Sequence, residues 1–251
     1  MKAMNKYNYR VMLKDGIEIR NKKLIAVITV IILCFASMLW INVNDVVETY
    51  KAKEEKIILI DPGHGGIDGG AAAKDGTTEK NINLNIGLLL GANLKSQGYK
   101  VEFTRTEDVG LYSEEKSVKE KKYEDLNNRV KLKKDTNCDA FISIHLNTFP
   151  QANCKGAQVW YSNHEGSNEL AQIVQKTLRD KLEPTNKREA KAAGTQYKVL
   201  RGNDDMPGII VECGFLSNSE ECEKLKNEEY QRKIADAIAE SICIFLESGD
   251  N

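Results

Sequence analysis

Apolar residues recur along this chain with two spacings, which alternate from residue 57 towards the C-terminus. Short runs rich in Ile, Val and Phe predict buried β-strands. The predicted strands cover residues 57–61, 100–105, 140–145, 157–161, 198–200 and 208–212. Apolar residues at intervals of three and four predict amphipathic helices between them. The predicted helices cover residues 79–97, 124–134, 168–182 and 228–246.

Strands that alternate with helices are typical of an α/β fold. We therefore predict one α/β domain over residues 57–251, with a mostly parallel, twisted sheet flanked by helices on both faces. Thr77 or Thr78 is expected to cap the first helix. The second helix is expected to bury Leu126 and Val130.

An uncharged apolar segment at 24–41 is just long enough to span a bilayer. Seven basic and two acidic side chains precede it, so the positive-inside rule places residues 1–23 in the cytoplasm and the rest outside. A cleaved signal peptide would need small residues at the cut, and 35–38 fit that poorly. Leu33 before Cys34 argues against a lipoprotein site, and the basic flank argues against a core helix. A transmembrane signal anchor is favoured, with 42–56 as a linker.

Charge and cysteine spacing exclude two classes of function. Beyond residue 23 the chain carries 29 basic and 35 acidic side chains, a net charge of −6, which argues against a nucleic-acid binder. No Cys-x-x-Cys pair supports a thiolate zinc site. Cys138, Cys213 and Cys243 lie in apolar runs and are predicted core residues. Cys154 and Cys222 could form a disulfide, which their spacing does not establish.

Four residues carry the candidate chemistry. His64, His145 and Glu212 each end an apolar strand, where open α/β sheets bind their ligands. Glu79 opens the helix after the first turn. Two imidazoles and one carboxylate form a recognised catalytic zinc set, with the fourth position left for water. A further carboxylate would move the proton of that water.

Simpler interpretations of the same residues exist. A lone histidine after a strand is more often hydrogen-bonded structure than a metal ligand. Glu79 could be only a favourable negative charge near the positive end of its helix dipole. Glu212 is harder to explain in this way, because a carboxylate that closes a buried strand needs a partner or a cation. His164 lies in a polar loop and is predicted to be a solvated surface residue.

Together the motifs resemble those of the zinc-dependent N-acetylmuramoyl-L-alanine amidases, over about residues 57–246. The motifs are Asp61-Pro62-Gly63-His64-Gly65-Gly66, Glu79-Lys80, Ser143-Ile144-His145-Leu146-Asn147 and Val211-Glu212-Cys213-Gly214-Phe215-Leu216-Ser217-Asn218. The resemblance implies His64, Glu79 and His145 as ligands of one zinc ion, with Glu212 as the catalytic acid and base. The substrate implied is peptidoglycan, cut between the lactyl group of N-acetylmuramic acid and L-alanine.

Within this family the chain is most similar to the germination-specific amidases of spore formers, the CwlD group. The single anchor and the stretches at 143–150 and 155–158 carry this narrower resemblance. It implies a role in forming the muramic lactam of spore cortex, with the catalytic domain between the forespore membranes. Asn147 is a candidate for orienting substrate, although a strand-end asparagine equally often forms a turn.

Three alternatives remain at this stage. The chain could be a zinc peptidase that cuts within wall peptides, or a membrane-tethered wall-binding scaffold with a silent site. Activity could also require an activating or regulatory protein partner, with 106–122 as a docking or occluding segment. For so charged a stretch the favoured interpretation is a solvated loop.

Overall fold

The computed structural model describes residues 6–201 and 205–248. The chain divides into two units, Met1–Ala52 and Lys53–Asn251. Helix α1 (Lys6–Glu55) covers the described part of the first unit and ends at the start of the second, and its stretch Arg20–Thr49 is long and apolar enough to cross a membrane. A signal sequence near an N-terminus meets the same criteria. The segment predicted as a linker is therefore helical up to Glu55.

The second unit is built on one six-stranded sheet with the order β2-β1-β3-β6-β4-β5. The strands are β1 (Ile57–Pro62), β2 (Lys100–Phe103), β3 (Ala140–Asn147), β4 (Gln158–Tyr161), β5 (Lys191–Ala192) and β6 (Gly208–Phe215). The first four in the order run parallel, whereas β4 pairs antiparallel with β6 and parallel with β5. The prediction of a mostly parallel sheet is confirmed.

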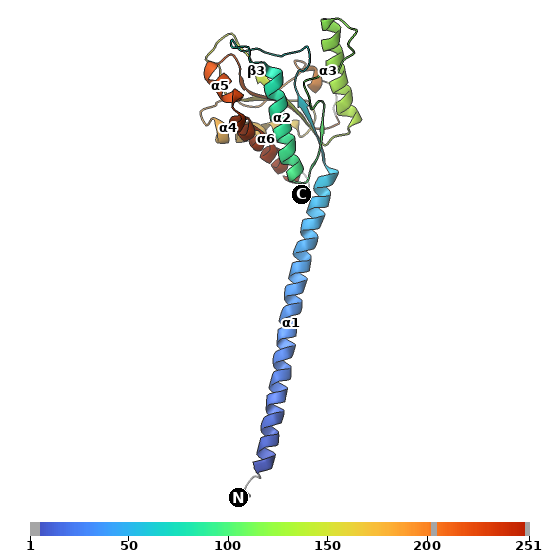
Figure 1. The fold of residues 1–251 in the computed structure, drawn as a ribbon, viewed down its shortest axis with the longest axis vertical. Coiled ribbons are helices and arrows are strands. Elements are labelled where there is room, and N and C mark those ends of the chain that lie inside the picture. The colour runs from blue at the N-terminus through green and yellow to red at the C-terminus, as the bar shows by residue number, and fades with distance from the viewer. Residues whose placement is uncertain (1–5, 202–204, 249–251) are drawn as a thin grey trace. The chain divides into compact units, whose positions relative to one another are not determined.

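Helices cover both faces of the sheet, as predicted (Figure 1). They are α2 (Glu79–Ser96), α3 (Val118–Asp135), α4 (Ser167–Leu182), α5 (Ser219–Lys226), α6 (Glu228–Ser248) and the short 3-10 helix η1 (Lys198–Leu200). The larger core lies between one face and α2, α4 and α6, and it contains Ile58 and Ile60. Leu59 points to the opposite face and packs with η1 residues. This alternation follows from the two-residue period of a strand.

Helix α3 differs most from its prediction. It begins at Val118, because Ser117 and Glu120 form a capping box. The expectation that it buries Leu126 was wrong, since that side chain is 38% exposed, and Val130 is only partly buried. The face towards the sheet instead carries buried charges: Lys121, Asp125, Arg129 and Lys133. A helix that packs through ion pairs leaves no apolar periodicity in its sequence.

Other local predictions were also corrected. Residues 198–200 form η1 rather than a strand, and helix α5 was not predicted. Thr78 is the N-cap of α2, but its side chain makes no capping hydrogen bond. Cys138, Cys213 and Cys243 are buried, as expected for core residues. No disulfide joins any of the six cysteines in the described structure, so Cys154 and Cys222 are not paired there.

Candidate metal and catalytic site

Neighbouring parallel strands bring the candidate residues to one edge of the sheet. His64 follows β1, while His145 lies near the end of β3 and Glu212 in β6. Because β1, β3 and β6 are adjacent and parallel, their carboxyl ends meet at the same edge. His145 and Glu212 are register partners, which places both side chains on the same face. Glu79 reaches this edge as the first residue of α2.

The turn that carries His64 has an uncommon backbone conformation. His64 has a φ of 63°, in the left-handed region, and Gly65 follows with a φ of 135°. Arg129 Nη2 donates to the carbonyl oxygen of His64 at 2.6 Å. Arg105 Nη2 donates to the carbonyl oxygen of Gly63 at 2.9 Å. Two buried guanidinium groups therefore hold the turn in place.

Backbone amides orient the carboxylate of Glu79. Its Oε1 accepts from the amide of Leu146 at 2.9 Å and its Oε2 from the amide of Ala71 at 2.8 Å. Asn83 Nδ2 donates to Oε1 at 3.2 Å from one turn further along α2. The side chain is only 4% exposed, so Glu79 is a fixed acceptor group rather than a mobile surface charge.

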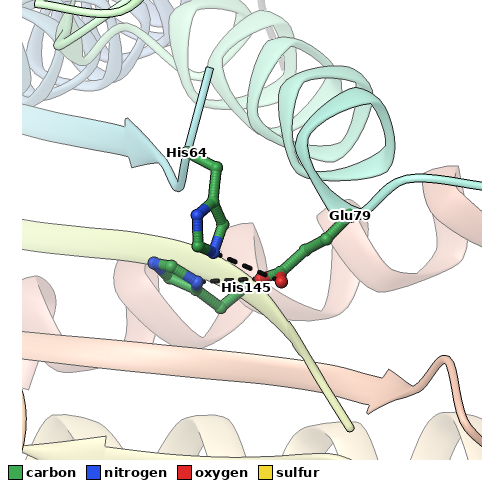
Figure 2. A group of neighbouring side chains, drawn as sticks. All are labelled: His64, Glu79 and His145. Carbon is green, nitrogen blue, oxygen red and sulfur yellow. Dashed lines mark hydrogen bonds and ion pairs between the residues drawn. The ribbon is translucent and has the colours of Figure 1, made fainter. Parts of the chain in front are cut away.

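His64, Glu79 and His145 converge on one point (Figure 2). One donor atom from each lies within 4.8 Å of the others, so the three could hold a metal ion. His64 Nε2 lies 3.2 Å from Glu79 Oε2, and His145 Nδ1 lies 2.9 Å from Glu79 Oε1. Two nitrogens and one carboxylate oxygen are the donor set of catalytic zinc sites with an open fourth position.

The hydrogen bonds of His64 indicate that a proton or a metal ion lies between its Nε2 and the Glu79 carboxylate. Asp68 Oδ2 lies 2.8 Å from His64 Nδ1, so this nitrogen carries the proton and donates it to Asp68. In a neutral His64, Nε2 is then a lone-pair acceptor that faces the Glu79 carboxylate, which is unfavourable unless a proton or a metal lies between them. Burial lowers the pKa of His64, but its hydrogen bonds to Asp68 and Glu79 outweigh this and raise the pKa to about 9. Although burial opposes it, the adjacent imidazoles hold the pKa of Glu79 well below its usual range.

Glu212 completes the constellation as a buried carboxylate that is not one of the three convergent groups. It is 6% exposed, and its Oε1 accepts from the hydroxyl of Tyr197 at 3.4 Å. Among the described residues, its Oε2 has no hydrogen-bond partner. Burial raises the pKa of Glu212 against the opposing charge of His145. A raised carboxyl pKa with one free oxygen suits a group that accepts and returns a proton near neutrality.

A groove of about 590 Å³ opens beside these residues. Its lining includes His64, His145 and Tyr197. Helix α3 contributes a second wall, and the segment 196–201 contributes a third. The candidate site therefore faces a cavity large enough for part of a peptide or sugar chain.

Sequence reasoning missed two residues of this site. Asp68 follows His64 by four residues, and a carboxylate so near a candidate ligand histidine was a usable signal. Tyr197 gave none, since its contact with Glu212 depends on how η1 packs. Asn147 lies where the register of β3 and β6 shifts, and its carbonyl accepts from the amide of Leu216 at 2.9 Å.

His164 differs from its prediction as a solvated surface residue. It is half-buried, and its Nδ1 is buried without a hydrogen-bond partner among the described residues. It does not line the groove beside the convergent residues. The structure therefore separates His164 from the two histidines of the candidate site.

Comparison with known proteins identifies the family. The model of the N-acetylmuramoyl-L-alanine amidase family matches residues 58–243, about three quarters of the chain. The chain belongs to the N-acetylmuramoyl-L-alanine amidases. The enzyme class inferred from the four sequence motifs is thereby confirmed.

The relatives include proteins of the germination-specific kind. The germination-specific N-acetylmuramoyl-L-alanine amidase of Bacillus subtilis is 39% identical over 198 residues, which cover 78% of this chain and 82% of the relative. The CwlD amidase from Clostridioides difficile, solved in complex with the GerS lipoprotein, is 42% identical with a TM-score of 0.75. That comparison covers 77% of this chain and 100% of the solved chain. The predicted resemblance to the CwlD group is confirmed.

A second solved amidase, from Clostridium difficile 630, is 33% identical with a TM-score of 0.67. The match covers 78% of this chain and 98% of that chain. These two solved chains thus consist almost wholly of the domain that matches here. This supports the use of residues 53–251 of the amidase as an independently folding unit.

Proposed function

We propose that this amidase holds one zinc ion through His64, Glu79 and His145, and cleaves the bond between the lactyl carbonyl of N-acetylmuramic acid and L-alanine. The observation that carries the proposal is the convergence of three metal-donor groups beside a buried carboxylate with an unpartnered oxygen. The amidase family supplies the bond that is cut.

The residues around the site have separate roles in the proposed reaction. Asp68 holds the proton on His64 Nδ1, which directs Nε2 to the metal position. The Leu146 and Ala71 amides hold Glu79. When bound, zinc would polarise the scissile carbonyl and lower the pKa of a water molecule to about 7. Glu212 accepts the proton of the attacking water and delivers it to the departing alanine amine.

The products follow from this proton transfer. A stem peptide leaves with a free amino group on L-alanine, and the sugar keeps a free lactyl carboxylate. Tyr197 donates to Glu212 and remains protonated, because burial raises the pKa of its hydroxyl. Its hydrogen bond therefore holds one oxygen of Glu212 and leaves the other for the proton. We also assign Asn147 to substrate orientation, from its place at the end of β3.

The proposal extends to where the enzyme works. Residues 24–41 would anchor it in the membrane with residues 1–23 in the cytoplasm, and the catalytic domain would act outside. In a spore former this is the space between the forespore membranes. There the cleavage would prepare muramic acid for a deacetylase, which gives the muramic lactam of the cortex. The CwlD relative was solved with a lipoprotein, and a partner of that kind is part of the proposal.

Product analysis by mass spectrometry tests the reaction. Residues 53–251 with one equivalent of zinc should release stem peptides that begin with L-alanine from purified peptidoglycan. A chelator should abolish the release, and added zinc should restore it. Peptides cut at an internal bond would instead identify a peptidase. Binding of peptidoglycan without any product would identify a scaffold.

The cellular role requires a separate experiment. The full chain should restore muramic lactam to the cortex of a Bacillus subtilis strain that lacks its germination-specific amidase. The chain with Glu212→Gln should not restore it. If the active enzyme is made in the forespore and no lactam forms, the cortex role fails while the amidase reaction stands.

A further inference from the structure

One cation in the groove has no acceptor. Lys198 Nζ is buried, and among the described residues it has no hydrogen-bond partner. It lies 3.8 Å from the centre of the Tyr123 ring, on the wall formed by α3. A cation–π contact satisfies none of the three N–H donors, so this ammonium retains its capacity to bind an acceptor. Leaving buried donors unpaired is costly, and a ligand acceptor would remove that cost.

The protein holds this lysine firmly in position. The next residue, Val199, accepts a hydrogen bond through its carbonyl oxygen from Lys133 Nζ at 2.6 Å. Lys133 is a fully buried residue of α3. The side chains of Val199 and Leu200 pack in the smaller core under the sheet. Because η1 is fixed from both sides, the Lys198 ammonium is a preorganised donor rather than a mobile surface group.

Most charges along the groove are already paired. Asp61 and Asp125 both bind Arg129. Asp68 binds Lys122 at 2.8 Å as well as His64. Lys198 is left without a counter-charge among the described residues that line the groove near the site. The groove therefore offers an unused positive charge, which favours an anionic ligand group.

The same loop connects Lys198 to the catalytic residues. Tyr197 precedes it, and the hydroxyl of Tyr197 donates to Glu212. Both residues line the groove together with His64 and His145. A substrate placed for cleavage would therefore extend past Lys198. The sugars of peptidoglycan carry hydroxyl and acetamide groups without charge, whereas the stem peptide carries carboxylates.

We propose that Lys198 binds a carboxylate of the stem peptide, and so positions the peptide on the side of the site formed by α3 and η1. This inference rests on the proposed amidase reaction and names the substrate group that the groove recognises. Tyr123 is 66% exposed and forms the outer edge of the same subsite. Its ring keeps the ammonium in place without neutralising it.

Kinetics on two muramoyl peptides test the proposal, one with free stem-peptide carboxylates and one with these groups amidated. For Lys198→Met, kcat/KM on the free-carboxylate peptide should fall about 10- to 100-fold, the range of a lost charge-assisted hydrogen bond. On the amidated peptide the same variant should match the wild type. Lys198→Arg should retain most of the wild-type kcat/KM on the free-carboxylate peptide. Inhibition by the released stem peptide gives a second readout, and the variant should weaken it by a similar factor.

Lys191→Met is the matched control, since Lys191 also lies over an aromatic ring, that of Trp160, but outside the groove. It should leave kcat/KM on both peptides, and the inhibition by the released stem peptide, unchanged. Equal losses on both peptides for Lys198→Met would show a structural role and overturn the proposal. No loss on either would overturn it as well. If the zinc-loaded wild type cleaves neither peptide, the proposed reaction itself fails, which is a distinct result.

Discussion

Asp68 accepts a hydrogen bond from His64 Nδ1 at 2.8 Å, and thereby decides which nitrogen of His64 faces Glu79 and the proposed metal position. The hydrogen bond with His64 also holds the pKa of the Asp68 carboxyl below its usual range, so the group is ionised at neutral pH. Carboxylate–histidine–metal arrangements of this kind fix the ring and raise the basicity of the ligand nitrogen.

Asp68→Asn should therefore weaken zinc binding about 10- to 100-fold without unfolding the domain. Competition with a chelator of known affinity measures the loss. Asp180→Asn is the control, because Asp180 is exposed and pairs with Lys176 one helical turn away. Equal zinc affinity for Asp68→Asn and the wild type would show that Asp68 does not support the ligand.

The glycine before His64 leads to a second prediction. A Cβ on Gly63 would lie 2.3 Å from ring atoms of His145, so Gly63→Ala must displace that imidazole. A misplacement of about 1 Å is expected to lower kcat/KM roughly 100-fold and to weaken zinc binding. Gly69→Ala is a control from the same turn, since its nearest contact is Thr78 Cγ2 at 3.8 Å. Similar behaviour of the two variants in zinc titration would contradict this account of Gly63.

The sequence predicted those parts of the molecule that depend on local pattern. The strands that end at His64, His145 and Glu212 follow from short apolar runs, and their convergence follows from the geometry of a parallel sheet. Glu79 was recognised because it opens the first helix that follows the glycine turn. Such signals lie within a few residues of the side chain concerned.

Long-range contacts explain what was missed. The buried face of α3 is charged because Arg129 reaches Asp61, 68 residues away along the chain. No local pattern shows that partner, so the helix was predicted to begin late and to bury Leu126. Tyr197 contacts Glu212 only because η1 packs against the sheet, in the smaller core that also includes Val130 of α3. The excursion at 106–122 is mostly exposed as expected, but its residues 118–122 belong to α3 rather than to a loop, and Asp108 within it accepts from the amide of Gly66.

The buried pair of Asp61 and Arg129 yields a prediction about acid stability. Burial raises the pKa of Asp61, but Arg129 and the Ser143 and Thr104 hydroxyls outweigh this and hold it below the ordinary value of 3.8. A carboxyl whose pKa is lower in the folded than in the unfolded protein stabilises the fold at pH values above its unfolded pKa. This contribution is lost as pH falls through the folded value. The free energy of unfolding should therefore decrease as pH falls below about 4, the unfolded value.

Urea unfolding of residues 53–251 from pH 7 to pH 3 measures this dependence. Asp61→Asn should cost about 3 to 5 kcal/mol at pH 7, because it removes one partner of a buried ion pair. Its stability should then change less with pH in the acid range than that of the wild type. Asp180→Asn should follow the wild-type curve. Parallel curves for Asp61→Asn and the wild type would show that Asp61 does not contribute to the acid sensitivity.

Replacement of the proposed acid and base gives the most direct test of the reaction. Gln at position 212 keeps the shape of Glu212 and can still accept from the Tyr197 hydroxyl, but it cannot take up a proton. The kcat of Glu212→Gln should fall about 10²- to 10⁴-fold, while zinc content and melting temperature stay near wild type. Glu221→Gln is the matched control. Glu221 is also buried with a raised pKa, which burial causes, but both of its oxygens accept from backbone amides, those of Gly156 and Phe215. Folded, zinc-loaded Glu212→Gln enzyme with wild-type kcat would remove Glu212 from the proton transfer.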